Sequence, residues 1–167
     1  MKTRDIVTAG LLTAFAIIIP LWFGGVLGIV IPPFSATIAS HVPVMLAMAV
    51  NPVVALVVGV GSALGFLLKG MPIVIVARAA MHPVFAFAGA AMIKRGMSFT
   101  KALVFTLPIH AGLEALVVMP FGFDIYSALV VVGVGTLLHH SIDSVISFAV
   151  YRSLISAKIF ANPGKAA

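Results

Sequence analysis

Ionisable side chains occur in pairs four residues apart within stretches that are otherwise apolar. The pairs are Arg78 with His82, His110 with Glu114, and His139 with Asp143. Residues four apart lie on one face of a helix, so each stretch would carry a single polar stripe. An ionisable group at the centre of a bilayer costs about 2.5–3.5 kcal/mol on insertion scales and therefore needs a partner, a cavity or a function. The three stripes are expected to face one another inside a helical bundle.

The depth of each polar group follows from its distance to the end of its stretch, at about 1.5 Å per residue. Arg78 and Glu114 each lie six residues from a proline at the outer end. Both are therefore expected about 9 Å deep on antiparallel helices. His82 and His110 fall near the midplane. Asp143 is expected near the cytoplasmic side, too deep to meet Glu114.

Two interpretations of the outer groups are open. Arg78 and Glu114 either form a structural ion pair or line a polar cavity for a ligand, and the accompanying histidines favour the cavity. His82 and His110 either hydrogen-bond a neighbouring helix or contact the ligand, and His41 reaches either the cavity or the headgroups. All five residues belong to the predicted substrate-binding set. A structural hydrogen-bonded cluster is the favoured interpretation of three further residues, His139, His140 and Asp143.

The composition predicts an all-α integral membrane protein. The chain has 167 residues, of which 62% are hydrophobic and 8% charged, and its mean hydropathy is +1.26. Average soluble domains are about 25% charged. A bilayer crossing takes about 20 apolar residues, so the chain has room for about six spans in a single transmembrane domain over 1–167. The predicted spans are 5–23, 36–50, 52–68, 72–93, 100–119 and 125–157.

The segment between the first two spans, "WFGGVLGIVIPPFSAT", is apolar but too rich in glycine and proline to cross the bilayer. Irregular backbone exposed to lipid would leave peptide groups without partners. The segment is therefore predicted to be a capping loop that lies against the protein. Trp22 and Phe34 in it either belong to an interfacial aromatic belt or cover a ligand, and both join the predicted substrate-binding set.

The basic residues predict the orientation. With six spans and the N-terminus inside, eight of the ten lysines and arginines are cytoplasmic. By the positive-inside rule both termini are then cytoplasmic. The basic residues are too scattered for a phosphate-binding stripe, so nucleic acid is not a predicted partner. The eight are Lys2, Arg4, Lys94, Arg95, Lys101, Arg152, Lys158 and Lys165.

Small residues recur at helical spacing in two spans. Gly10 and Ala14 are four apart in the first span, with Ala9 and Thr13 adjoining, and "GVGSALG" carries glycines at 61 and 65 in the third. Such faces let helices approach closely. Internal packing is the favoured interpretation for the third span. In the first span the face serves either internal packing or the docking of another membrane protein.

These features together resemble the substrate-binding S components of energy-coupling factor (ECF) transporters. The first-helix pattern of that family, Ala-x-x-x-Ala, reads Gly10-Leu-Leu-Thr-Ala14 here, and "IPPFSATIASHVPVMLAM" and "ARAAMHPVFAFAGA" resemble the small-vitamin subgroup. The resemblance implies a prokaryotic cell-membrane protein that captures a vitamin from outside without chemical conversion. It further implies docking, through the first helix, on a transmembrane coupling protein driven by two ATP-binding subunits, and toppling in the membrane to release the vitamin.

The chain has no phosphate-binding Gly-x-x-x-x-Gly-Lys-Ser/Thr loop, so ATP is expected only in partner subunits and no cofactor in this chain. Two alternatives come from other classes. An intramembrane hydrolase is disfavoured because His110 and Glu114 lack the His-Glu-x-x-His arrangement, and neither a catalytic residue nor a metal site is predicted. A proton or ion pathway through His82, His110 and His139 stays open.

Arg78 bears on the identity of the vitamin. A guanidinium pairs with a carboxylate through two parallel hydrogen bonds, which favours pantothenate or nicotinate, with pantothenate preferred. If Glu114 neutralises Arg78 instead, the histidines would bind a neutral ring such as pyridoxine or hydroxymethylpyrimidine. The predicted partner-binding residues are Gly10, Ala14, Ala9 and Thr13.

Overall fold

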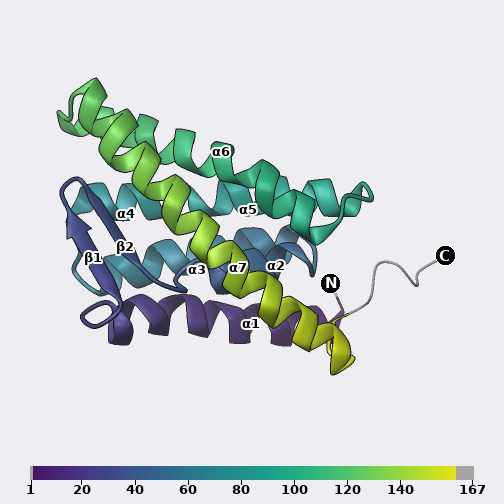
Figure 1. The fold of residues 1–167 in the computed structure, drawn as a ribbon. Helices are drawn as coiled ribbons and strands as arrows, with labels where there is room; N and C mark the ends of the chain where they lie inside the picture. The colour runs from purple at the N-terminus through teal and green to yellow at the C-terminus, as the bar shows by residue number, and fades with distance from the viewer. Residues whose placement is uncertain (1, 161–167) are drawn as a thin grey trace.

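The computed structural model describes residues 2–160. Figure 1 shows helices packed side by side along the molecule, with a β-hairpin at one end and α7 crossing obliquely over the others. Four helical segments are long and apolar enough to cross a membrane: Thr3–Phe23, Ile73–Lys94, Phe99–Phe121 and Ser127–Ser156. Exposed apolar side chains lie along these segments, as lipid contact requires. The chain therefore has the form of a multi-pass membrane protein.

The first helix, α1 (Thr3–Ile18), continues into one wider turn, η1 (Ile19–Phe23). Pro20 lies in this turn, and a proline has no amide hydrogen to continue the helical bonding pattern. The Nζ of Lys69 donates a 2.6 Å hydrogen bond to the Pro20 carbonyl. This lysine, on the loop after α3, therefore fastens the end of the first helix.

The predicted capping loop is an ordered antiparallel hairpin. Strand β1 (Gly28–Ile31) pairs with β2 (Phe34–Thr37), with Gly28 opposite Thr37. The second predicted span, 36–50, differs most from the structure. Its first residues belong to β2, and helix α2 (Val42–Met48) has only seven residues, about 10 Å. It is too short to cross, and six membrane-crossing helices are not found in the described residues.

Helix α3 (Pro52–Leu68) begins at a side-chain cap, because the Oδ1 of Asn51 accepts a 2.9 Å bond from the amide of Val54. Two glycines of α3, Gly61 and Gly65, let α1 pack closely against it. A Cβ at Gly65 would lie 3.0 Å from the Cα of Ile17, and one at Gly61 would collide with the side chain of Thr13. The predicted internal packing of these two glycines is confirmed.

The predicted span 72–93 is divided into α4 (Ile73–Ala79) and α5 (His82–Lys94). Pro83, at the start of α5, cannot donate to the carbonyl four residues earlier. The backbone instead closes a tighter turn, from Met81 N to Arg78 O at 2.9 Å. A Cβ at Gly59 of α3 would lie 2.6 Å from the backbone of Pro83, so this break packs directly on a glycine.

The last two predicted spans, 100–119 and 125–157, correspond to the helical segments Phe99–Phe121 and Ser127–Ser156. Helix α6 (Phe99–Val118) ends in a short 3-10 turn, η2 (Met119–Phe121). Gly122 then takes a left-handed conformation with φ of +87°, which favours glycine. The wider turns of η3 (Ser127–Val134) lead directly into α7 (Gly135–Ser156).

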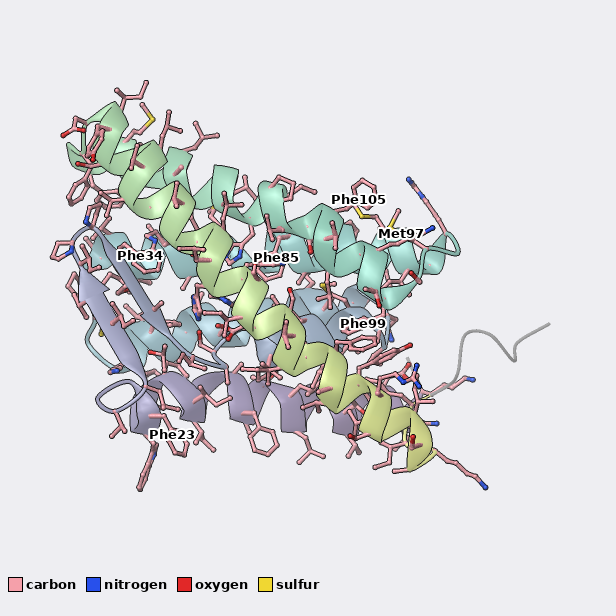
Figure 2. The ribbon with its side chains drawn as sticks, in the orientation of Figure 1. Phe23, Phe34, Phe85, Met97, Phe99 and Phe105 are labelled. Atoms are coloured by element: carbon pink, nitrogen blue, oxygen red, sulfur yellow. The ribbon has the colours of Figure 1, made fainter. Side chains whose placement is uncertain are left out.

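The two ends of the bundle differ in chemistry. The N-terminus, the α5–α6 connection and the end of α7 lie together, opposite the hairpin (Figure 1). The described basic residues that were predicted to be cytoplasmic lie on these segments, and Lys165 is outside the described residues. Figure 2 shows Phe34 at the hairpin end, Phe85 in the middle and Phe99 towards the basic end.

Candidate functional site

The buried polar residues gather beneath the hairpin, between β2 and helices α4 to α7. Arg78, His82, His110 and Glu114 are each at most 3% exposed. Arg78 is near the end of α4, His82 begins α5, and the other two lie one turn apart on α6. The structure therefore brings together the polar stripes of α4, α5 and α6, as the spacing predicts.

Arg78 and Glu114 form a buried ion pair. The Nη2 and Nε of Arg78 donate to Oε2 of Glu114 at 2.6 and 3.1 Å. The hydroxyl of Thr136 on α7 donates to the same oxygen at 2.6 Å. Three donors thus converge on Oε2, while Oε1 faces the neighbouring imidazoles.

Arg78 also holds the hairpin. Its Nη1 donates to the Pro33 carbonyl at 3.2 Å and its Nη2 to the Ser35 carbonyl at 3.4 Å. Its guanidinium carbon lies 5.1 Å from the centre of the Phe34 ring, within the range of a cation–π interaction. The guanidinium of Arg78 therefore connects the hairpin to Glu114.

The histidines form a connected group around Oε1 of Glu114. His41 Nε2 lies 3.1 Å from His82 Nε2, and His82 Nδ1 lies 2.9 Å from the Ser62 hydroxyl. His110 Nε2 lies 3.3 Å from Oε1, and His82 Nε2 lies 3.8 Å from it. The imidazoles therefore contact one another as well as the carboxylate.

Asp143 lies closer to this group than its position in the sequence suggests. Its carboxylate accepts the amides of Ala39 and His41 at 2.7 and 3.0 Å. The same carboxylate lies 3.2 Å from His41 Nδ1 and 3.2 Å from His139 Nε2. Asp143 was predicted to lie too deep to meet Glu114. The contacts found for it are to Ala39, His41 and His139, and His41 in turn connects it to His82. The turn before α2 enters the bundle, and α7 crosses obliquely to meet it (Figure 1).

A small cavity opens between the hairpin and the ion pair. Its volume is about 20 Å³, which is enough for about one water molecule. Arg78, His82, Glu114 and His41 of the predicted set line it. The other lining residues are Ser35, Ala36, Thr37, Ser40, Phe66, Ile75, Ala79 and His139.

The two aromatic candidates differ in placement. Phe34 is buried, and a Cβ at Gly135 would lie 2.8 Å from its ring, so it fixes β2 on α7 beside Arg78. Trp22 is 80% exposed and does not line the cavity. It lies at the end of the first helical segment, before the hairpin, so its side chain meets the surroundings of the protein instead.

Sequence reasoning missed Ser62 and Thr136 as parts of the site. Both are almost completely buried. Thr136 is four residues before His140 and seven before Asp143, so it continues the polar stripe of α7. Ser62 is the polar residue within the glycine-rich face of α3. Either could have been found as a polar group that needs a partner inside an apolar helix.

The small residues of α1 divide between two faces. Ala9 is 5% exposed and belongs to the core, so within this fold it is not free to contact a partner. Thr13 faces α3, where it packs at Gly61. Gly10 and Ala14 are exposed on the outer face. The face available to another protein is therefore narrower than predicted.

Comparison with curated proteins identifies one clear relative. The chain is 36% identical over 158 residues to the niacin transporter NiaX of Lactococcus lactis subsp. cremoris (strain MG1363). The match covers 85% of this chain and 70% of the relative. No protein-family model matches the chain, and no solved structure matches it.

Proposed function

This chain belongs to the S components, the substrate-binding membrane subunits of ECF vitamin transporters, and we propose that the vitamin it captures is nicotinate. S components bind their vitamin without converting it, so the chain is a binding subunit. The name of the relative supports nicotinate over pantothenate, the acid preferred from the sequence. The buried side chains of the site give this choice a physical basis.

The observation that carries the proposal is the bonding of Arg78. A guanidinium has five N–H donors. The shorter bonds of Arg78, at 2.6 and 3.1 Å, go to Glu114, while the bonds to the hairpin carbonyls are 3.2 and 3.4 Å. A carboxylate accepts charge-assisted bonds that are about twice as strong as neutral ones. Besides its bonds to Glu114, Arg78 therefore has the N–H donors that now make the longer bonds to the hairpin carbonyls. With these donors Arg78 would bind a second carboxylate.

The size of the cavity supports a small, flat acid. At about 20 Å³ it is far below the roughly 300 Å³ or more of typical ligand pockets, so the hairpin must shift to admit any vitamin. Nicotinate is one aromatic ring with one carboxylate, and it requires a smaller shift than the long chain of pantothenate. Its ring would lie between Phe66 and Ile75 on one side and the imidazoles on the other.

Titration calorimetry on the purified chain tests this proposal with three ligands. We expect tight binding of nicotinate, much weaker binding of nicotinamide, which has the same ring without the charge, and weaker binding of pantothenate. Arg78→Gln should remove the preference for the acid over the amide, because the remaining side chain cannot distinguish them by charge. Tighter binding of pantothenate than nicotinate, or an unchanged preference in Arg78→Gln, would contradict the proposal.

We propose further that the chain lies in a prokaryotic cell membrane with both termini cytoplasmic, and that it docks on a coupling protein with two ATP-binding subunits. The basic end of the bundle supports this orientation through the positive-inside rule. The exposed Gly10 and Ala14 support docking on α1, since small residues let helices approach closely.

Gly10→Leu tests the docking face, because apart from the adjacent residues and the nearby backbone of α1 itself no described atom lies within 4 Å of a Cβ at this position. The variant should bind nicotinate like the parent but fail to copurify with the coupling module. The exposed Leu11→Ala, on the same helix, is the matched control and should retain the partner. Normal copurification of Gly10→Leu would place the docking face elsewhere.

A further inference from the structure

Three imidazoles and one carboxylate converge beneath the hairpin. His41, His82, His110 and Glu114 are all buried, and one ligating atom from each lies within 4.8 Å of all the others. We propose that these four residues bind a divalent transition-metal ion of the zinc class. This proposal does not depend on which vitamin the chain captures. It departs from the sequence-based expectation of no metal site.

The distances between the ligating atoms fit a tetrahedral ion. Zinc bonds of about 2.0–2.1 Å to nitrogen and oxygen place neighbouring ligand atoms about 3.3 Å apart. His110 Nε2 and Glu114 Oε1 are separated by 3.3 Å, His41 Nε2 and His82 Nε2 by 3.1 Å, and His82 Nε2 and Oε1 by 3.8 Å. These three of the six separations are close to the tetrahedral value, and the other three lie within 4.8 Å, so the side chains would draw together to surround one ion.

The hydrogen bonds of His140 determine where the proton of His110 lies. The Leu103 carbonyl only accepts, so His140 Nε2 must donate to it across 3.1 Å. In neutral His140 the other nitrogen, Nδ1, is then an acceptor, and His110 Nδ1 donates to it at 3.1 Å. The Nε2 of neutral His110 therefore carries a lone pair.

That lone pair points at another acceptor. His110 Nε2 is fully buried, has no hydrogen-bond partner within residues 2–160, and lies 3.3 Å from Oε1 of Glu114. Two acceptors facing each other in a buried site repel unless a cation lies between them. A proton on His110 Nε2 would remove this repulsion. A metal ion between the two atoms would bind both of them, and it would also explain why the imidazoles of His41 and His82 face the same centre.

Each imidazole presents Nε2 to the centre, and two of the three present Nδ1 to an outer hydrogen-bond partner. Such partners fix the orientation and tautomer of histidine ligands in metal sites. Glu114 is held in the same way, since Oε2 accepts from Arg78 and Thr136 and only Oε1 faces inwards. The outer partners are Ser62 for His82 at 2.9 Å and His140 for His110 at 3.1 Å. For His41, Asp143 Oδ2 lies 3.2 Å from Nδ1 but does not form a hydrogen bond with it in this arrangement.

The donor set indicates the class of ion. Three imidazoles with one carboxylate suit Zn²⁺, Co²⁺ or Ni²⁺, and the chain has no cysteine thiolate to favour a softer ion. The carboxylates of Glu114 and Asp143 carry two negative charges and Arg78 carries one positive charge, so the buried cluster has a net negative charge that attracts a cation. From the sequence, His82, His110 and Glu114 could be placed together by helical spacing, whereas His41 could not be assigned because it lies in the turn before α2.

Metal binding is tested on the full chain in detergent, purified without a polyhistidine tag and freed of bound metal ions with a chelator. We expect it to take up one Zn²⁺ per chain, measured by elemental mass spectrometry. With Co²⁺ it should develop the strong visible absorption of a tetrahedral site. His82→Ala and His110→Ala should lose stoichiometric binding, and Ser62→Ala should weaken it about 10–100-fold.

His139→Gln distinguishes the proposed site from the neighbouring group of His41, His139 and Asp143, since His139 lies outside the four proposed ligands. It should keep the Co²⁺ spectrum.

Substoichiometric uptake of Zn²⁺ by the folded parent chain would overturn the proposal. So would loss of the ion in His139→Gln with retention in His82→Ala and His110→Ala, which would place the ion at His41, His139 and Asp143 instead. If a histidine variant fails to fold, Ser62→Ala supplies the decisive measurement. Nicotinate calorimetry on the stripped chain reports separately on the vitamin proposal.

Discussion

The half of the bundle under the hairpin and the half at the basic end are built in opposite ways. Under the hairpin, buried charges and imidazoles contact one another around a small cavity. Towards the basic end the interior is apolar, with Phe99 stacked on Tyr151 at a ring separation of 4.2 Å. The apolar half needs only close packing, whereas the polar half needs every group to have a partner. We therefore expect substitutions in the polar half to affect ligand binding and those in the apolar half to affect stability alone, except where a buried charge loses its partner.

Glu114→Ala should have the largest effect. It leaves the buried guanidinium of Arg78 without its anionic partner, and breaking a buried pair in this way costs about 3–5 kcal/mol. The midpoint of thermal unfolding in detergent should fall accordingly. Glu114→Gln keeps an acceptor for Arg78 and Thr136, so its unfolding midpoint should fall less than that of Glu114→Ala. Equal midpoints for the parent and Glu114→Ala would mean that the polar half tolerates an unpaired charge.

Phe34→Ala should separate binding from stability at the hairpin. The variant loses the ring that packs on Gly135 and lies 5.1 Å from the Arg78 guanidinium carbon. Cation–π and packing contributions of about 1–2 kcal/mol correspond to roughly a 5–30-fold weaker nicotinate affinity. Stopped-flow measurements should assign this loss to faster dissociation. Phe34→Tyr, which keeps the ring, should stay close to the parent.

Phe99→Leu, in the apolar half, should lower thermal stability without changing nicotinate affinity. Losing the stacked ring of a buried aromatic pair costs about 0.5–1.5 kcal/mol, so thermal stability should fall slightly. The dissociation constant for nicotinate should not change, because Phe99 lies towards the opposite end from the hairpin (Figure 2). Tyr151→Phe preserves the stack and serves as the control. A weakened affinity in Phe99→Leu would show that the two halves are coupled.

Trp22→Ala should have the smallest effect. An exposed side chain away from buried features contributes within about 0.5 kcal/mol, and Trp22 is 80% exposed. Its nicotinate affinity and unfolding midpoint should both match those of the parent. A loss of affinity comparable to that of Phe34→Ala would return Trp22 to the binding site, where the sequence pattern had placed it.

Helical spacing was sufficient to predict which polar residues of α4, α5 and α6 meet. His110 and Glu114 share a face of α6, and Arg78 could be matched to Glu114 by counting residues from the proline at the outer end of each stretch. His41 could not be assigned to the cavity, because an apolar stretch that contains it resembles a span by composition. The short α2, buried at all seven positions, shows that apolar character can reflect burial within protein instead of contact with lipid.

Counting failed where the chain departs from straight parallel helices. The depth assigned to Asp143 assumed that the last span runs alongside its neighbours, whereas α7 crosses them obliquely (Figure 1). The hairpin likewise could not be deduced, since its residues carry little alternation of polar and apolar side chains and β1 is largely exposed. These features depend on tertiary packing and not on local preference.

The connection between Arg78 and the hairpin uses main-chain acceptors. Because the carbonyls of Pro33 and Ser35 belong to the backbone, any side chain at these two positions that preserves the turn would preserve the connection. The connection thus depends on the side chain of Arg78 and not on the side chains of the two hairpin residues that it contacts.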